Sequence, residues 1–368
     1  MKPARWGAAL ALAGSAYAAC SAPFDPPDYI NTLRVLLVRV DTLDADIDAD
    51  GVPDPTPTPV GSYARPGETV TFKMQYADGR DFDSTQSVAP VLVAWIGGCW
   101  NPPGNDYYGC YEVLGQRLQG LQAGELPPEV AVAPGLTDFS ITVPTDVLDA
   151  VGEPDAGGPR VAQGFVFFLV CAGTLGPVQQ SGDTEAGSFP IGCFDGSGRE
   201  LGAEGFVPGY TQVFVFDDGR RNLNPVVTGL SYDDQVFAAD APPPQIQRCA
   251  VSEEERRKSG CAATDEFTEC TTVTFDVAVP DDVAEIDPGA LDPNGEPLRE
   301  VVWVSYFTDG GQFDSATKLV SDSAKGIQRG HETAWVPPEE PGLYTVWAVV
   351  RDNRGGSTIV QQLVEVTE

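Results

Sequence analysis

Residues 341–353 read Pro-Gly-Leu-Tyr-Thr-Val-Trp-Ala-Val-Val-Arg-Asp-Asn. As an extended chain, the part from Tyr344 to Val350 is apolar on both faces, which is typical of a central strand in a β-sandwich. Segments 91–96, 165–170 and 301–307 have the same character. These four runs predict an all-β protein with buried central strands.

Strict alternation of apolar and polar residues predicts further strands that are buried on one face only. The apolar members are Val70, Phe72, Met74 and Tyr76 in one strand and Val273, Phe275, Val277 and Val279 in another. The 40 glycines and 32 prolines supply many turns, which suits short strands better than long helices. One or two helical turns are predicted within 112–121.

The order of predicted strands repeats in the two halves of the chain. The matching segments are 34–40, 69–76, 91–96 and 165–171 in the first half and 225–232, 271–279, 301–307 and 343–350 in the second. The third strand of each set contains a tryptophan, Trp95 or Trp303, and a buried Trp there resembles an immunoglobulin-like sandwich. The inter-sheet cysteine pair of antibody domains is missing, so the resemblance is to the broad class. Two unrelated β domains would also align this loosely.

The end of the chain carries a more specific resemblance. Residues 341–353, then Gly355-Gly356 and the run 360–366, resemble the last hairpin of PKD-like and cadherin-like domains, and the similarity covers about 225–368. That resemblance implies adhesion, spacing or display, and rarely catalysis.

We therefore expect two immunoglobulin-like β-sandwich domains, at 31–222 and 223–368. The first should have long disulfide-stapled loops, because 97–144 and 172–208 are rich in Gly and Pro and contain cysteines. Long loops on a rigid sandwich are where binding usually resides.

The first 19 residues predict an export signal. Lys2 and Arg5 form a basic head, an apolar run covers 6–19, and small residues close it. The run is shorter than the roughly 20 apolar residues that a membrane span needs, and no other segment is as long. Membrane attachment is therefore expected only through a lipid anchor.

Cys20 directly follows Ala18-Ala19, which resembles the lipobox of bacterial lipoproteins, where the cysteine is lipidated. The departure is Tyr17, where the family usually has Leu. Ordinary signal-peptidase cleavage after Ala18 is the alternative. Lipidation predicts a protein held in the cell envelope or at the cell surface, on a bacterial outer membrane, with 20–30 as a Pro-rich tether.

The charge of the chain limits its partners. Lysine and arginine number 22 and aspartate and glutamate 54, so the net charge is −32. Phosphate backbones would be repelled, which excludes nucleic acid, and anionic lipid surfaces are disfavoured for the same reason. Divalent cations and basic partners are favoured.

Eight cysteines in an exported chain predict disulfides. Cys99 with Cys110, and Cys171 with Cys193, each bracket one loop. The pairing among Cys249, Cys261 and Cys270 stays open, with one thiol left over.

Segment 46–54 reads Asp-Ile-Asp-Ala-Asp-Gly-Val-Pro-Asp and resembles the calcium loop of thrombospondin type-3 repeats and the first half of an EF-hand loop. The ligands that this resemblance implies are the side chains of Asp46, Asp48, Asp50 and Asp54 and the carbonyl of Val52. Pro57 stands where an EF-hand has its bidentate acid, so the predicted Ca²⁺ site is weak. A proline-stiffened acidic insertion that binds nothing specifically is the alternative.

The loop 99–111 concentrates aromatic residues between two cysteines. Trp100, Tyr107 and Tyr108 are the candidate binding residues, because aromatic side chains on a stapled loop contact sugars and proteins at low entropic cost. The alternative is that these rings fold back and cap the sandwich.

Catalytic motifs are missing from the sequence. His331 is the only histidine, and the chain has no Gly-x-Ser-x-Gly elbow, no phosphate-binding Gly-Lys-Ser/Thr loop and no dinucleotide fingerprint. We therefore expect a surface binding or structural module of adhesion type, not an enzyme, with an unidentified protein or glycan partner. The competing hypothesis is a secreted glycan-binding or glycan-active protein that uses the loop 99–111.

Overall fold

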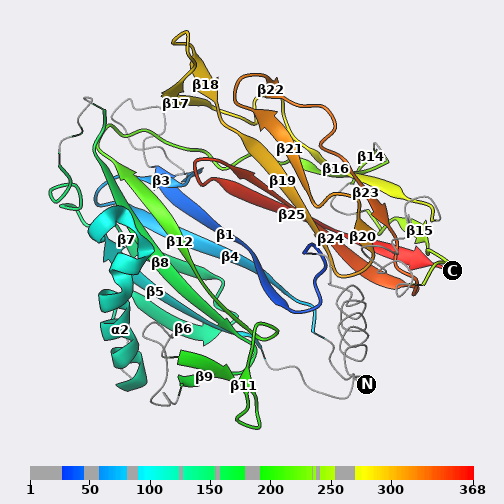
Figure 1. Cartoon of the computed structure of the whole chain (residues 1–368), viewed down its shortest axis with the longest axis horizontal. Coiled ribbons are helices and arrows are strands. Elements are labelled where there is room, and N and C mark those ends of the chain that lie inside the picture. Colours follow the sequence, from blue (N-terminus) through cyan, green and yellow to red (C-terminus); the bar gives the residue numbers. More distant parts are fainter. Residues whose placement is uncertain are drawn as a thin grey trace, which may run out of the picture.

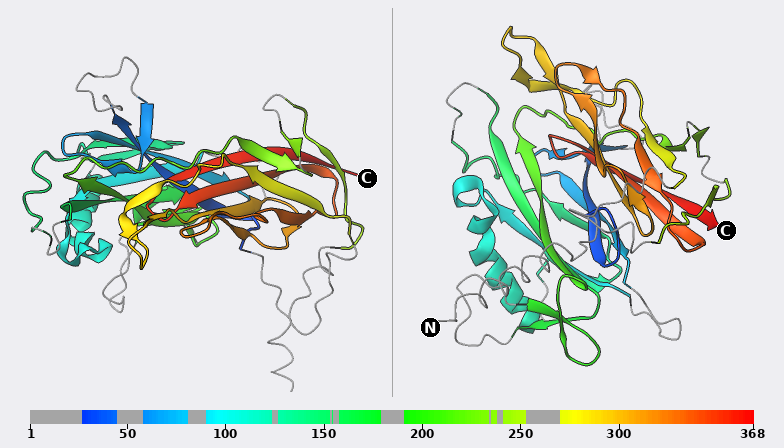
Figure 2. Two further views of the ribbon diagram at one scale, coloured as in Figure 1. Left: turned by 90° about the horizontal axis from the view of Figure 1, so that it is seen from above. Right: turned by 45° about the vertical axis from the view of Figure 1, so that its right-hand side comes forward.

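The computed structural model describes residues 27–44, 58–80, 90–123, 127–152, 154, 158–178, 191–233, 235–237, 241–252 and 270–368. These residues form two β-sandwiches that lie side by side (Figures 1 and 2). Within the described ranges, every helix is too short or too polar to span a bilayer. The all-β prediction, with two immunoglobulin-like sandwiches, is confirmed.

The first sandwich carries the helical elements of the described chain and two main sheets. Its elements are β1 (Leu33–Asp44), β2 (Thr58–Gly61), β3 (Tyr63–Ala64), β4 (Thr69–Asp78), β5 (Leu92–Trp100), η1 (Pro103–Asn105), η2 (Tyr107–Cys110), α2 (Tyr111–Ala123), β6 (Val130–Pro134), β7 (Asp138–Thr142), β8 (Val161–Cys171), β9 (Thr174–Pro177), β10 (Ile191–Phe194), β11 (Glu200–Leu201) and β12 (Phe206–Phe216). A sheet ordered β2-β1-β4-β7 faces one ordered β3-β12-β8-β5-β6, and β11-β10-β9 form a small third sheet.

The second sandwich is built entirely from strands and turns. Its elements are β13 (Gly229–Tyr232), β14 (Gln235–Val236), β15 (Gln245–Gln247), β16 (Val273–Ala278), β17 (Ile286–Leu291), β18 (Pro297–Arg299), β19 (Val302–Thr308), β20 (Gln312–Phe313), β21 (Thr317–Asp322), β22 (Gly326–Ile327), β23 (Thr333–Val336), β24 (Gly342–Asp352) and β25 (Ser357–Thr367). A sheet ordered β14-β13-β16-β23-β20 faces one ordered β15-β25-β24-β19-β21-β22, and β17 and β18 form a separate hairpin.

The core of the first sandwich follows the predicted alternation. In β4, Val70, Phe72 and Met74 point inward, and the residues between them are more exposed. Trp95 on β5 is fully buried, stacks on Phe139 at a ring distance of 5.6 Å, and donates from Nε1 to the carbonyl of Leu136. Its hydrogen bond satisfies the one polar atom that this large side chain takes into the core.

The prediction that Trp303 is a buried core residue, like Trp95, is wrong. In β19, Val302, Val304 and Tyr306 point into the second core, so Trp303 lies on the opposite face of the sheet and is only half-buried. A one-residue difference in register moves a side chain to the other face of a strand. The core tryptophan of this sandwich is Trp335 on β23, which is fully buried.

Helix α2 is longer than the predicted one or two turns and covers the outer face of the β12-β8-β5 sheet. Leu114 and Leu118 pack there against Phe165, Phe167 and Leu169 of β8. Burying each leucine contributes about 1.5–3 kcal/mol. The helix explains why β8 is apolar on both faces: one face lines the sandwich core and the other lies under α2. Figures 1 and 2 show α2 on the side away from the second sandwich.

Three disulfides staple the described chain. Cys99–Cys110 and Cys171–Cys193 are the two pairs predicted from the sequence. The third joins Cys249 to Cys270, a choice that the sequence left open. Cys261 and Cys20 lie outside the described residues.

An apolar contact joins the two sandwiches. Trp347 and Val349 on the outer face of β24 pack against Leu36 and Leu37 of β1 and against Ile30, which precedes β1. The backbone N–H of Ile30 also donates to the carbonyl of Thr308 at 2.7 Å. Residues 27–30, the end of the predicted tether, are therefore packed against the second sandwich.

A buried polar junction continues this contact around Asn222. Its Nδ2 donates to Ser62 Oγ at 2.9 Å and to Asp352 Oδ2 at 3.2 Å, and its carbonyl accepts from the Ser62 N–H at 3.0 Å. Gly61 has φ +124°, and a Cβ there would lie 1.8 Å from the Asn222 carbonyl oxygen. Only glycine fits this approach, so the connection between the sandwiches is held closely on both sides.

Arg354 links two acids of this junction, the buried Glu300 and the partly exposed Glu285. Its Nε donates to Glu300 Oε1 at 2.6 Å and its Nη2 to Glu285 Oε2 at 2.8 Å. Glu300 is almost completely buried, and this burial, with the nearby charge of Asp352, raises its pKa to about 7. The junction thus confines several carboxylates around one guanidinium.

Candidate functional site

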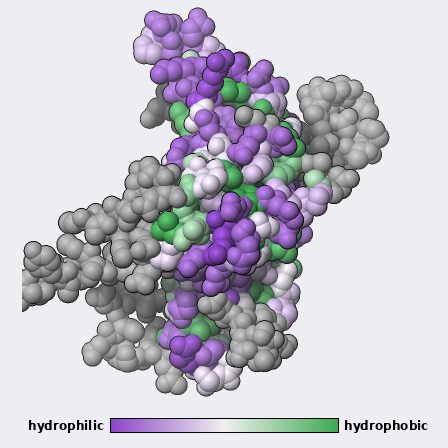
Figure 3. All heavy atoms as spheres, turned by 90° about the vertical axis from the view of Figure 1, so that its right-hand side faces the viewer, coloured by the Kyte–Doolittle hydropathy of each residue, from purple (hydrophilic) through white to green (hydrophobic). Residues whose placement is uncertain are grey.

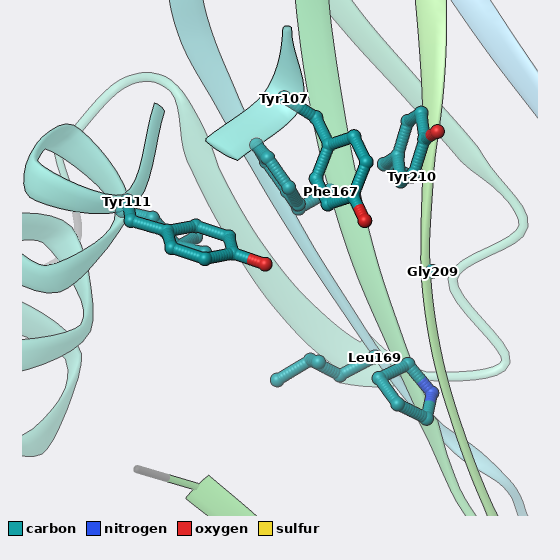
Figure 4. A pocket seen from close by; sticks show the side chains of 8 residues that line it. Tyr107, Tyr111, Phe167, Leu169, Gly209 and Tyr210 are labelled. Atoms are coloured by element: carbon teal, nitrogen blue, oxygen red, sulfur yellow. The ribbon is translucent and has the colours of Figure 1, made fainter. Parts of the chain in front are cut away.

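The candidate site is an open pocket on the outer face of the first sandwich, beside the N-terminal end of α2 (Figure 4). Its volume is about 200 Å³. Its walls come from η2, α2, β8 and β12. The lining residues are Tyr107, Tyr111, Leu114, Phe167, Leu169, Pro208, Gly209 and Tyr210.

The loop that supplies Tyr107 is fixed at both ends. The disulfide Cys99–Cys110 ties the end of β5 to the start of α2, with a Cα–Cα distance of 5.8 Å. Asp106 caps η2 by accepting from the Tyr108 N–H at 3.3 Å. A Cβ at Gly109 would lie 2.8 Å from Pro102 Cβ, so the loop is tightly packed against itself. The tyrosines of this loop are therefore presented in a preset arrangement.

Aromatic rings contact one another along one wall. Tyr107 and Tyr210 are stacked, with centroids 4.5 Å apart and an interplanar angle of 22°, and Figure 4 shows their rings side by side. The ring centroid of Tyr210 also lies 5.8 Å from that of Phe165 and 6.1 Å from that of Phe167. Tyr111 meets Tyr107 edge-on at 6.2 Å from the other side of the opening. The rings form a rigid aromatic surface around a small apolar space.

The pocket carries no charged side chain among its lining residues. Its side-chain polar atoms are the tyrosine hydroxyls. A hydrogen bond with the Tyr108 hydroxyl raises the pKa of Tyr107, and partial burial raises that of Tyr111. These hydroxyls therefore stay neutral near pH 7, so the pocket offers ring surface and a few neutral polar groups.

The structure places the three aromatic candidates of the loop differently. Tyr107 lines the pocket. Tyr108, 57% exposed, lies beside it and touches Tyr107 and Tyr111. Trp100 lies on the opposite face of β5, packs against the first core, and covers Gly164. The loop thus divides its aromatic side chains between the core and the pocket.

Sequence reasoning missed Tyr210, Phe167 and Pro208. Tyr210 lies on β12, a strand that the sequence analysis did not predict. Alternation within 206–216 carries the missing signal, since Val213 and Val215 point into the core and Pro208 and Tyr210 point outward. Recognising that alternation would have placed Tyr210 on the outer face.

Strand β12 also presents a partly free edge. Its pairing with β3 is limited to Phe214 and Val215, so 206–212 has no strand partner on that side within the described residues. Pro208 lies in the middle of this free stretch. Proline lacks an N–H and blunts an edge against the addition of another strand.

The predicted calcium ligands Asp46, Asp48, Asp50, Val52 and Asp54 lie outside the described residues. The strands on either side of them are described: Asp44 of β1 pairs with Thr58 of β2. The segment therefore connects two antiparallel strands. Elsewhere in the described ranges, no group of three or more His, Cys, Asp or Glu side chains is arranged to hold a metal ion.

His331, the only histidine, lies on the second sandwich. Its Nδ1 contacts Asp276 Oδ1 at 2.5 Å, and this hydrogen bond raises the pKa of the imidazole. The Tyr306 hydroxyl donates to the His331 carbonyl at 3.0 Å. These contacts join the segment that precedes β23 to β16 and β19, remote from the tyrosine pocket in the sequence and in the fold.

Comparisons with known proteins give weak structural similarities. No protein-family model matches the chain, and no curated protein matches it. The chain is similar to dimeric latent PorU from Porphyromonas gingivalis, with 13% identity, 92% of this chain and 24% of that one covered, and a TM-score of 0.20. It is also similar to a 1.5-MDa bacterial ice-binding adhesin, with 11% identity and a TM-score of 0.17. The similarity covers 82% of this chain and 58% of that one.

A third similar structure is the C-terminal domain of the antigen I/II-family protein AspA from Streptococcus pyogenes. The identity is 9%, the coverage is 90% of this chain and 100% of that domain, and the TM-score is 0.18. The chain thus spans less than two thirds of the first two structures. These TM-scores are too low to establish a shared fold.

Proposed function

We propose that the protein is an exported, non-catalytic binding module that holds its partner at the tyrosine pocket of its first sandwich. The observation that carries this proposal is the preset pocket itself, in which stacked rings are held by a disulfide, a helix and two strands. Binding sites gain affinity when their contact groups are ordered in advance. Aromatic side chains also dominate the energetics of many interfaces.

The second sandwich fits the role of a support. It packs against the first through Trp347 and the Asn222 junction, and the pocket lies on the far side of the first sandwich. Its face in Figure 3 is covered mainly by hydrophilic residues with small apolar patches between them. A partner bound at the pocket would therefore approach without obstruction from the second sandwich.

Export is supported by the disulfides, because such bonds persist mainly in oxidising compartments. Lipidation at Cys20 would hold the protein at a membrane, and the family resemblance adds adhesion or display as its biological use. We propose the cell surface as its location.

A glycan partner is the competing proposal, because stacked rings such as Tyr107 and Tyr210 also suit sugars. A bound sugar must satisfy its many hydroxyls, and each buried group left without a hydrogen bond costs about 1–3 kcal/mol. The lining offers few polar side-chain atoms for this purpose. The pocket therefore favours a protein partner.

We predict that the variant Tyr107→Ala with Tyr210→Ala loses capture of cell-surface partners. Truncating one hot-spot aromatic costs about 2 kcal/mol, roughly 30-fold in affinity. The measurement is retention of surface proteins and polysaccharides on the immobilised mature protein, after circular dichroism shows that each variant is folded. Leu343→Ala, at a 63% exposed position on β24, is the control and should capture normally. Equal capture by the double variant would remove the pocket from the proposal, and hydrolysis of a captured glycan would contradict a non-catalytic role.

We further propose that the segment 46–54 binds Ca²⁺ weakly, in the range of about 10⁻⁴ to 10⁻³ M. Titration calorimetry with millimolar calcium should give a binding isotherm for the mature protein. Asp48→Ala should reduce or abolish it, because one carboxylate ligand is lost. Identical, flat titrations for both proteins would show that the segment holds no calcium.

A further inference from the structure

We infer that the tyrosine pocket accepts an arginine side chain from a basic protein partner. This inference rests on the proposed function, because it names the group that the same pocket would bind.

The size of the pocket limits what it can enclose. Pockets for drug-sized ligands measure roughly 300–1,000 Å³, and this one measures about 200 Å³. It is large enough for one side chain, and too small for an aromatic cluster or several sugar rings. A partner would therefore insert one group and contact the surrounding surface with the rest.

The walls of the pocket favour a cation. Four of the lining side chains are aromatic: Tyr107, Tyr111, Phe167 and Tyr210. A cation within about 6 Å of a ring centroid is attracted to the face of the ring, and arginine uses this contact more often than lysine. The planar guanidinium can also stack on a ring, as an ammonium group cannot.

Within the described residues, the same contact occurs at two places in the structure. The guanidinium of Arg220 lies 5.0 Å from the ring of Phe216, and that of Arg354 lies 5.7 Å from the ring of Tyr63. Neither arginine lines the pocket. Among the described residues, no lysine or arginine lines the pocket, so its rings are left without a cation from this part of the chain.

The charge around the pocket is negative, as binding of a cation requires. Asp106 and Glu112 are exposed and adjoin Tyr107 and Tyr111 in the sequence, and the whole chain carries −32. The arginine of α2, Arg117, pairs with Glu129 at 2.7 Å and does not line the pocket. A basic partner is therefore attracted over a long range, whereas a second copy of this acidic chain is repelled.

The edge of β12 indicates whether the partner binds by adding a strand or by inserting a side chain. An extended peptide could in principle pair with the free stretch 206–212, because exposed strand edges accept added strands. Pro208 interrupts that edge and cannot donate to an added strand. The pocket beside Pro208 thus remains the specific feature, and we expect recognition of an inserted side chain.

The test uses two synthetic hexapeptides that differ only in one residue, arginine or citrulline, titrated into the mature protein by calorimetry. Citrulline keeps the planar shape and removes the charge. We expect the arginine peptide to bind about tenfold more tightly, which lies between the values for an exposed and a fully desolvated cation–π contact and suits these partly exposed rings. Tyr210→Phe should keep this preference because it keeps the ring, and Tyr210→Leu should reduce it because one of the four rings is lost. Tyr210 is 45% exposed and both variants retain an apolar side chain there, so we expect both to fold, and circular dichroism checks this.

The outcomes separate this inference from the proposed function. Equal binding of both peptides, lost in Tyr210→Leu, would overturn the choice of a cation and leave the pocket as a binding site. Binding that is indifferent to Tyr210→Leu, or no binding of either peptide, would overturn the arginine inference. The proposed function is decided separately, by the capture assay with the Tyr107→Ala and Tyr210→Ala double variant. Phosphatidylcholine vesicles test a lipid source of the cation. Retention on these vesicles, without binding of the arginine peptide, would likewise overturn the inference of a protein partner.

Discussion

Replacing Arg354 by methionine should lower the free energy of unfolding by about 3–5 kcal/mol at pH 8. Arg354 is buried and donates to Glu300 and to Glu285, and Glu300 is 1% exposed. Methionine fills part of the same volume and removes the charge, so Glu300 and Asp352 remain buried without their shared cation. The cost arises mainly from these uncompensated carboxylates.

The destabilisation should depend on pH in a defined direction. The pKa of Glu300 is raised to about 7 in the folded protein, so the folded state holds this proton more tightly than the unfolded state does. The stability that Glu300 contributes therefore falls as pH rises from about 4.5 to 7, by about 3 kcal/mol for a shift of this size. Removing Arg354 raises the pKa of Glu300 further, so Arg354→Met should be much less damaging at pH 5 than at pH 8.

Urea unfolding of the mature protein at pH 5 and pH 8 measures both effects. Glu300→Gln should flatten the pH dependence between 4.5 and 7 and partly rescue Arg354→Met in the double variant. Arg199→Met is the control, because Arg199 pairs with Asp195 at 3.1 Å in an exposed position and such surface pairs contribute little to stability. Equal loss of stability for Arg354→Met at both pH values would show that the buried acids do not determine it.

Local patterns predicted the strands well because alternation reports the face on which a residue lies. The strands at Val70–Met74 and Val273–Val277 were predicted from such patterns, and their inward faces are those expected. For Trp303, alternation could not predict the face. Its segment is apolar on both faces, so alternation does not fix which face points inward, and contacts with other strands decide the register.

The candidate site was only half predictable for a related reason. The cysteines and tyrosines of the loop 99–111 indicated a binding site, and Tyr107 does line the pocket. Tyr210 and Phe167 come from β12 and β8, far away in the sequence, and no local pattern links them to the loop. The helix α2 likewise shows its role only in three dimensions, since it covers a sheet face that would otherwise be exposed.

The contact between the sandwiches was also hidden in the sequence. The run at 344–350 was interpreted as a central strand, which it is, but its second apolar face covers the first sandwich. Apolar residues on both faces of a strand show only that both are buried. They do not show whether a neighbouring sheet, a helix or another domain covers them.

Trp347→Ala should therefore uncouple the two sandwiches. Trp347 is 8% exposed and packs with Ile30, Leu36 and Leu37, outside the core of its own sandwich. Removing a buried tryptophan costs about 3–5 kcal/mol, and here the cavity would open between the sandwiches, where the surrounding residues belong to separate cores.

We expect the wild-type protein to unfold in one calorimetric transition and Trp347→Ala in two, the earlier one several degrees lower. Trp303→Ala is the matched control, because Trp303 lies on the same face of the same sheet, is half-buried, and is not part of the interface cluster. Its loss should leave a single transition. The second transition should be specific to Trp347, because this side chain alone of the two connects β24 to the first sandwich. If Trp347→Ala also unfolded in one transition, the polar junction at Asn222 would have to hold the sandwiches together without the apolar contact.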